Sequence, residues 1–135
     1  MIPEFDDNGY LPPGIHPATL AEIEARFGRE PEIRRAEMQS LHWLIDLARR
    51  AGVKRIVLNG SFVTDRYEPN DVDCALLIDA GLLKDPVAQS EIAAGLPFVE
   101  IKLVSQTDFD YMVETVFGSD RDMVPKGVVE IVKWN

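Results

Sequence analysis

The stretch that decides the fold spans Leu58–Cys74 and reads LNGSFVTDRYEPNDVDC. An apolar run leads into Gly60 and Ser61, and nine residues separate this turn from Asp71. Asp73 follows at the start of a second apolar run, and residues two apart on a strand point to the same face. Because two adjacent carboxylates repel each other unless a divalent cation lies between their oxygens, the pair predicts a metal site.

The composition favours one small domain. With 135 residues, 46% of them hydrophobic, the chain can bury one core, and we expect a single domain over residues 1–135. The net charge of −9 argues against a broad nucleic-acid surface, since such binding requires Lys and Arg to neutralise phosphates. A small ligand that arrives with Mg²⁺, or a basic protein partner, fits this charge better.

The start of the chain and its cysteine content bear on location. Residues 1–7 lack the basic start and apolar core of a signal peptide, and no apolar run approaches the roughly 20 residues of a membrane span. A single cysteine excludes an internal disulfide. We therefore expect a soluble, cytoplasmic protein that does not contact a membrane.

The part of the chain before the motif predicts an arm and two helices. Residues 1–18 combine a turn signal with a proline-rich run that is unsuited to a helix. Thr19 and Glu22 form a capping box for a helix over 20–27, and a longer helix is expected over 31–51. We expect the charged residues on the polar face of the longer helix to be solvated. These charged residues are Arg34, Arg35, Glu37, Arg49 and Arg50.

The remaining pattern predicts strands that alternate with helices. Strands are expected over 53–58, 72–78, 98–104 and 128–134, with Ala80-Gly81 closing the second. Residues 82–94 favour a helix that starts no earlier than Pro86, or an irregular crossover. Residues 106–117 favour a helix capped by Thr107. This order predicts an α+β (mixed α/β) fold, with one small mixed sheet and helices packed on it.

The motif resembles the signature of the nucleotidyltransferase superfamily, especially that of its minimal members. The shared pattern is hydrophobic-Gly-Ser, nine residues, then Asp-hydrophobic-Asp-hydrophobic, with Pro69 before the aspartates as is common there. The resemblance implies a nucleotidyltransferase-like fold in which Gly60-Ser61 contact the triphosphate of a nucleotide. It also implies that Asp71 and Asp73 bind Mg²⁺, as one ion or two, and that a third carboxylate on a neighbouring strand helps to activate the attacking hydroxyl.

The whole chain also resembles a family of short, mostly uncharacterised bacterial proteins that are nucleotidyltransferase-like by motif. Three blocks carry this likeness and together span nearly the whole chain. They are LPPGIHPAT at 11–19, GSFVTD at 60–65 with PNDVD at 69–73, and DRD at 120–122 with PKG at 125–127.

The third carboxylate has two candidates. Glu100 is the first, because it lies in the middle of the predicted strand 98–104. Glu100 and Lys102 also alternate with apolar residues, as the polar residues of an ordinary solvent-facing strand would. Glu130 is the reserve candidate, because it shares a strand face with Val128 and Val132. If neither lies near both aspartates, the site would bind a nucleotide without transferring it.

Two basic residues are candidate phosphate ligands. Arg66 and Lys126 carry charges that suit a triphosphate, and each also fits a solvated polar loop. With the Gly-Ser turn, they complete the predicted nucleotide-binding residues.

Two functions follow from these expectations. The first is an Mg²⁺-dependent enzyme that transfers a nucleoside monophosphate from a nucleoside triphosphate to a hydroxyl acceptor. Since minimal nucleotidyltransferases often act as antitoxins, this function includes the antitoxin of a toxin–antitoxin pair, with the toxin as its protein partner. The alternative is a catalytically degenerate fold that serves as a nucleotide- or protein-binding module.

Overall fold

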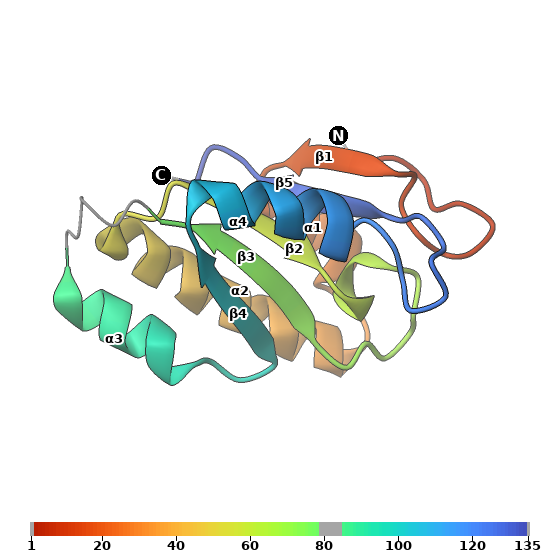
Figure 1. Cartoon of the computed structure of the whole chain (residues 1–135). Coiled ribbons are helices and arrows are strands. Elements are labelled where there is room, and N and C mark those ends of the chain that lie inside the picture. The colour runs from red at the N-terminus through yellow and green to blue at the C-terminus, as the bar shows by residue number, and fades with distance from the viewer. Residues whose placement is uncertain (1, 79–84, 135) are drawn as a thin grey trace.

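A single mixed sheet of five strands forms the centre of the protein (Figure 1). The computed structural model describes residues 2–78 and 85–134. The strands are β1 (Gly14–Ala18), β2 (Arg55–Asn59), β3 (Val72–Leu77), β4 (Val99–Val104) and β5 (Gly127–Ile131). They lie side by side in the order β1-β5-β2-β3-β4. β1 pairs with β5 and β3 with β4 in parallel, whereas β2 is antiparallel to both of its neighbours.

Helices cover both faces of this sheet. They are α1 (Leu20–Phe27), α2 (Glu32–Ala51), α3 (Pro86–Ala94) and α4 (Gln106–Tyr111), which continues into a π-helical turn, η2 (Met112–Val116). A short 3-10 turn, η1 (Ser61–Val63), follows β2. The predicted capping box is confirmed, since the Thr19 side chain accepts from the Glu22 backbone N–H and the Glu22 side chain accepts from the Thr19 backbone N–H. The α+β fold class is therefore confirmed.

The hydrophobic core has two parts, one on each face of the sheet. On one face, α1, α2 and α3 pack over the strand residues Ile56, Leu58, Cys74 and Leu76. On the other, α4 and η2 place Phe109, Val113 and Phe117 over Val57, Ala75, Leu77 and Val128. Among residues 2–78 and 85–134, α4 and η2 are the helical elements that contribute to this second part of the core, and Figure 1 shows α4 lying across the sheet.

The expectation of an arm over residues 1–18 is wrong for its last five residues. Residues 14–18 form β1, which pairs with β5 and lies at the edge of the sheet that the described residues form. Pro17 cannot donate a ladder hydrogen bond, and an edge strand is the place where a sheet tolerates this loss. The proline-rich composition that excludes a helix therefore did not exclude a strand.

Smaller differences concern the ends of elements. The cap of α4 is Ser105 rather than Thr107, and the last strand ends at Ile131 rather than at residue 134. The helix expected from Pro86 is confirmed, with Asp85 as its N-cap. The predicted end of the second strand at Ala80-Gly81, and the start of the 82–94 segment, lie outside the described residues.

The polar face of α2 contradicts the expectation that its charges are solvated. Arg35, Arg49 and Arg50 are exposed or partly exposed, but Arg34 and Glu37 are buried. The Arg34 guanidinium donates to four backbone carbonyls, those of Phe27, Phe62, Thr64 and Arg66. Arg34 is buried because of tertiary packing. The loop that follows η1 folds over the first half of α2, and the buried carbonyls of this loop require a hydrogen-bond donor.

Glu37 is fully buried, and neither of its carboxylate oxygens has a hydrogen-bond partner among the described residues. Burial raises the pKa of Glu37 from 4.5 to about 7, while the nearby Arg34 charge opposes the shift and Asp71 adds to it. The folded protein therefore holds this proton more tightly than the unfolded chain. Its stability falls as the pH rises from 4.5 towards about 7, and the penalty is complete above that range.

The variant Glu37→Gln is expected to stabilise the protein at pH 8 by roughly 3 kcal/mol and to leave its stability at pH 4 nearly unchanged. Urea denaturation at both pH values measures this difference. Equal effects at the two pH values would show that the carboxylate is ionised at no cost in the folded state.

Among the helices of residues 2–78 and 85–134, none combines the length and the apolar character that crossing a bilayer requires.

Candidate functional site

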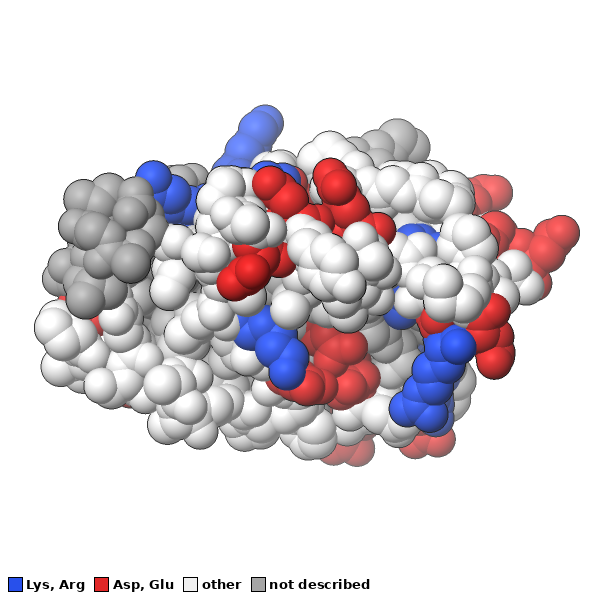
Figure 2. All heavy atoms as spheres, viewed as in Figure 1, with Lys and Arg blue, Asp and Glu red and all other residues white. Residues whose placement is uncertain are grey.

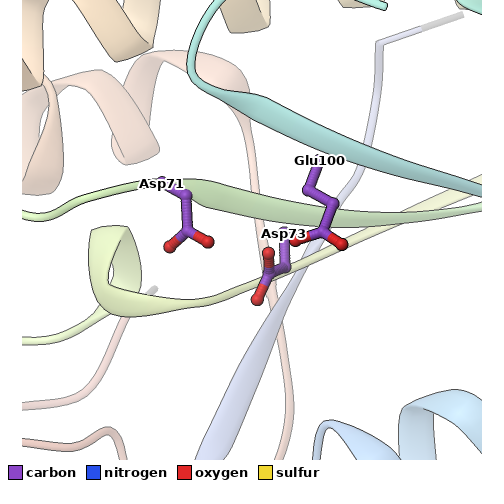
Figure 3. A group of neighbouring side chains, drawn as sticks. All are labelled: Asp71, Asp73 and Glu100. Atoms are coloured by element: carbon purple, nitrogen blue, oxygen red, sulfur yellow. The ribbon is translucent and has the colours of Figure 1, made fainter.

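Three carboxylates from neighbouring positions of the sheet meet at one point. Asp71 immediately precedes β3, Asp73 lies in β3, and Glu100 lies in β4 directly opposite Asp73. One carboxylate oxygen from each residue lies within 4.8 Å of the others. Figure 3 shows all three side chains on the same side of the sheet, with those of Asp73 and Glu100 close together. This acidic triad could hold a metal ion.

The charges of the acidic triad are mutually destabilising when no cation is present. Burial raises the pKa of Asp73 from 3.8 to about 7, and the charges of Asp71 and Glu100 contribute to the shift in the same direction. The Oδ1 atom of Asp73 is buried and has no hydrogen-bond partner among the described residues. A divalent cation would offset the repulsion between the carboxylates and would give the buried Oδ1 atom a partner. The three carboxylates therefore fit a hard metal ion.

The reserve candidate, Glu130, is engaged elsewhere. Its two carboxylate oxygens accept from the Arg55 guanidinium at 2.8 and 2.7 Å, and this contact raises the pKa of Arg55. The structure thus brings Glu100, and not Glu130, together with the two aspartates.

The glycine of the Gly-Ser turn lies against the triad. Gly60 has φ +88°, and a Cβ atom there would lie 3.1 Å from the backbone nitrogen of Asp73 and 3.2 Å from its Oδ2. Only a residue without a side chain combines this backbone conformation with so close an approach.

The variant Gly60→Ala is expected to lower the free energy of unfolding by about 2–3 kcal/mol. It should also lower the affinity for any ligand that Asp73 binds. Gly95→Ala is the matched control, because Gly95 has nearly the same φ, +91°, and a Cβ atom added there would meet nothing within 4 Å. The control should lose only the conformational part of this free energy, about 1–2 kcal/mol, because Gly95 has nearly the same ψ as Gly60 as well, 164° against −178°. Urea denaturation of both variants tests this difference, and equal losses would contradict the close approach.

A hydrogen bond of Ser61 connects the turn to the segment that carries the aspartates. Its hydroxyl oxygen accepts a hydrogen bond of 3.0 Å from the backbone N–H of Asn70, the residue before Asp71. The nine-residue spacing therefore closes a loop whose two ends are joined beside the triad.

An open pocket of about 860 Å³ lies in front of the turn and the aspartates. Six of the seven predicted site residues line it, namely Gly60, Ser61, Arg66, Asp71, Asp73 and Lys126. Glu100 is the exception, because it lies on the edge strand beside the pocket. Figure 2 shows several clusters of acidic side chains on the face that carries α4, with a few basic side chains between them and a largely uncharged surface around them.

Lys126 differs from Arg66 in its surroundings. Arg66 is exposed, whereas Lys126 is partly buried, and burial lowers the pKa of its amine. The charges of Asp73, Asp120 and Asp71 oppose this shift, which places the amine within electrostatic reach of two members of the triad.

Sequence reasoning missed three features of the pocket. Tyr10 donates a hydrogen bond of 2.6 Å to Asp120 and so joins the start of the chain to the loop over 118–126. Arg121, in that loop, supplies a third basic side chain to the pocket wall. Asn59 lines the pocket although it ends an otherwise apolar strand. A polar amide at the end of such a strand is the sequence feature that could have identified Asn59 as a site residue.

These observations define an α+β domain with an acidic cluster beside a glycine turn. The chain belongs to a family of unknown function (DUF6932), whose profile matches residues 3–132. Neither a curated protein nor a solved structure shows significant similarity to the chain.

Proposed function

We propose that this protein is an Mg²⁺-dependent nucleotidyltransferase that transfers a nucleoside monophosphate from a nucleoside triphosphate to a hydroxyl group. The observation that carries the proposal is the acidic triad within 4.8 Å, set against the Gly60-Ser61 turn at the wall of a pocket large enough for a nucleotide. The resemblance of the motif to nucleotidyltransferases points in the same direction.

In this proposal, separate groups of residues bind the cation and the phosphates. Asp71, Asp73 and Glu100 would hold the cation, which supplies charge neutralisation for the phosphates and the leaving oxygen when bound. Lys126, with Arg66 at the rim, attracts the phosphates into the pocket. Because Gly60 carries no side chain, the turn lies directly against Asp73, and phosphates held at the turn would lie next to the cation ligands.

The reaction is an in-line displacement at the α-phosphorus. The oxygen of the acceptor hydroxyl forms a bond to phosphorus, the bond to the bridging oxygen of the β-phosphate breaks, and pyrophosphate leaves. The hydroxyl proton passes to a carboxylate of the triad, and Glu100 is the member on the open edge of the sheet where an acceptor can approach. The openness of this edge favours an acceptor presented by a partner protein, such as the toxin of a toxin–antitoxin pair.

Calorimetric titration with each of the four nucleoside triphosphates, in Mg²⁺ and then in EDTA, tests the proposal. We expect at least one of them to bind with Mg²⁺ and to bind at least ~10-fold more weakly in EDTA. Incubation of the wild type with a nucleotide labelled at the α-phosphate and a host extract should then label an acceptor. Binding without any transfer would favour the nucleotide-binding module. The absence of binding by all four would contradict the enzyme and the nucleotide-binding module alike, and would leave the protein-binding module.

A further inference from the structure

Asn59 lies in the same row of the sheet as two members of the acidic triad. It is directly opposite Asp73 across the antiparallel pair β2–β3, and Asp73 is directly opposite Glu100 across the parallel pair β3–β4. Residues that face each other across an antiparallel pair project from the same face, with Cβ atoms roughly 4.5–5.5 Å apart. Asp73 is therefore flanked by Glu100 on one side and by Asn59 on the other.

The side chain of Asn59 is polar and buried, and its position in β2 does not explain why a polar side chain is there. It is 4% exposed, it lines the pocket, and its Oδ1 atom is buried with no hydrogen-bond partner among the described residues. A buried acceptor without a hydrogen-bond partner destabilises the folded state. Since the three preceding residues of β2 are buried and apolar, an apolar side chain would avoid this cost.

The unpartnered oxygen of Asn59 has a counterpart in the neighbouring strand. The Oδ1 atom of Asp73 is also buried and without a hydrogen-bond partner in the described part of the chain. Two acceptor oxygens in directly opposed positions, neither with a donor, indicate a bound group that supplies positive charge to both.

We propose that the side-chain oxygen of Asn59 is a fourth protein ligand for the cation held by Asp71, Asp73 and Glu100. This inference rests on the metal-binding part of the proposed function. An amide oxygen is an accepted ligand for Mg²⁺ and Ca²⁺, and it adds a ligand without adding a fourth negative charge to the site. It would bind the cation on the inner side of Asp73, away from the exposed edge strand that carries Glu100.

The test compares the affinity for Mn²⁺, measured by electron paramagnetic resonance, in the wild type, Asn59→Leu and Asp73→Asn. Asn59→Leu is expected to bind Mn²⁺ about 10-fold more weakly than the wild type, with an apo midpoint of unfolding that is unchanged or higher. Gln39→Leu, a similar change at an exposed position of α2, is the control and should keep the wild-type affinity. Tb³⁺ luminescence lifetimes in H₂O and D₂O should reveal about one additional bound water in Asn59→Leu.

The outcomes separate this inference from the proposed function. If the wild type binds Mn²⁺ and Asp73→Asn does not, wild-type affinity in Asn59→Leu overturns the role of Asn59 alone. If the wild type binds no divalent cation, the metal site of the proposed function fails as well. Should Asn59→Leu not fold, Asn59→Asp decides, because it keeps an oxygen ligand and is expected to bind at least as tightly as the wild type. Weaker binding by Asn59→Asp would overturn the inference.

Discussion

Replacing Asp73 by asparagine is expected to remove Mg²⁺-dependent stabilisation completely while making the apo protein more stable. The wild type should gain about 2.7 kcal/mol when Mg²⁺ is present at 100 times its Kd, and Asp73→Asn should gain nothing. Without Mg²⁺ at pH 8, the variant should exceed the wild type by roughly 2 kcal/mol, because it lacks a partly buried carboxylate that its neighbours repel. Nucleotide transfer should fall by at least ~100-fold.

Chemical denaturation with and without Mg²⁺ measures both effects of Asp73→Asn. Asp46→Asn is the matched control, because Asp46 is an exposed aspartate of α2 that pairs with Arg50. This control removes the same charge and should keep the Mg²⁺ response of the wild type, with a loss of a few tenths of a kcal/mol at most. A marked fall in the apo stability of Asp73→Asn would identify the aspartate as structural rather than metal-binding.

The variant Arg34→Met is expected to lower the free energy of unfolding by about 3–5 kcal/mol. Its guanidinium satisfies carbonyls in the loop over 62–66 and at the end of α1, and it lies beside the buried Glu37. Loss of the guanidinium leaves these carbonyls without a donor and the carboxylate without its neighbouring positive charge. The loop that carries the pocket wall should then become mobile, so nucleotide affinity should fall as well.

Urea denaturation at pH 8 measures the effect of Arg34→Met against Arg35→Met as its control. Arg35 is the next residue, and its guanidinium donates to the carbonyl of Arg29 in an exposed hydrogen bond, so the control should lose less than about 1 kcal/mol. Adding Glu37→Gln to Arg34→Met should restore part of the loss, because the unpaired carboxylate is removed. If Glu37→Gln stabilises Arg34→Met only by the roughly 3 kcal/mol that it adds to the wild type at pH 8, the two side chains are not coupled, whereas a larger gain measures their coupling.

Local pattern was sufficient for much of the fold and for part of the site. Short apolar runs and, over 98–104, the alternation of apolar residues located four of the strands, and the capping box located α1, because these signals act within a few residues. The same-face placement of Asp71 and Asp73 follows from the two-residue period of a strand. Their position beside the glycine turn, by contrast, depends on the pairing of β2 with β3, in which Asn59 lies opposite Asp73.

What the sequence could not provide depends on contacts between distant segments. The choice of Glu100 over Glu130 depends on the register of β3 with β4 and on the pairing of Arg55 with Glu130. The burial of Arg34 depends on a loop about 30 residues later in the chain, which no helical periodicity encodes. The first strand was missed because its proline is acceptable only at a sheet edge, and edge position is a property of the whole fold.

The central claim is that Asp71, Asp73 and Glu100 together bind a divalent cation. A crystal soaked in Mn²⁺ and measured for anomalous scattering tests it most directly. We predict an anomalous peak between the three carboxylates, within roughly 2.0–2.4 Å of their oxygens, and its absence from a soaked crystal of Asp73→Asn. A fully soaked wild-type crystal with no peak at the triad, or with Mn²⁺ bound only elsewhere, would contradict the claim.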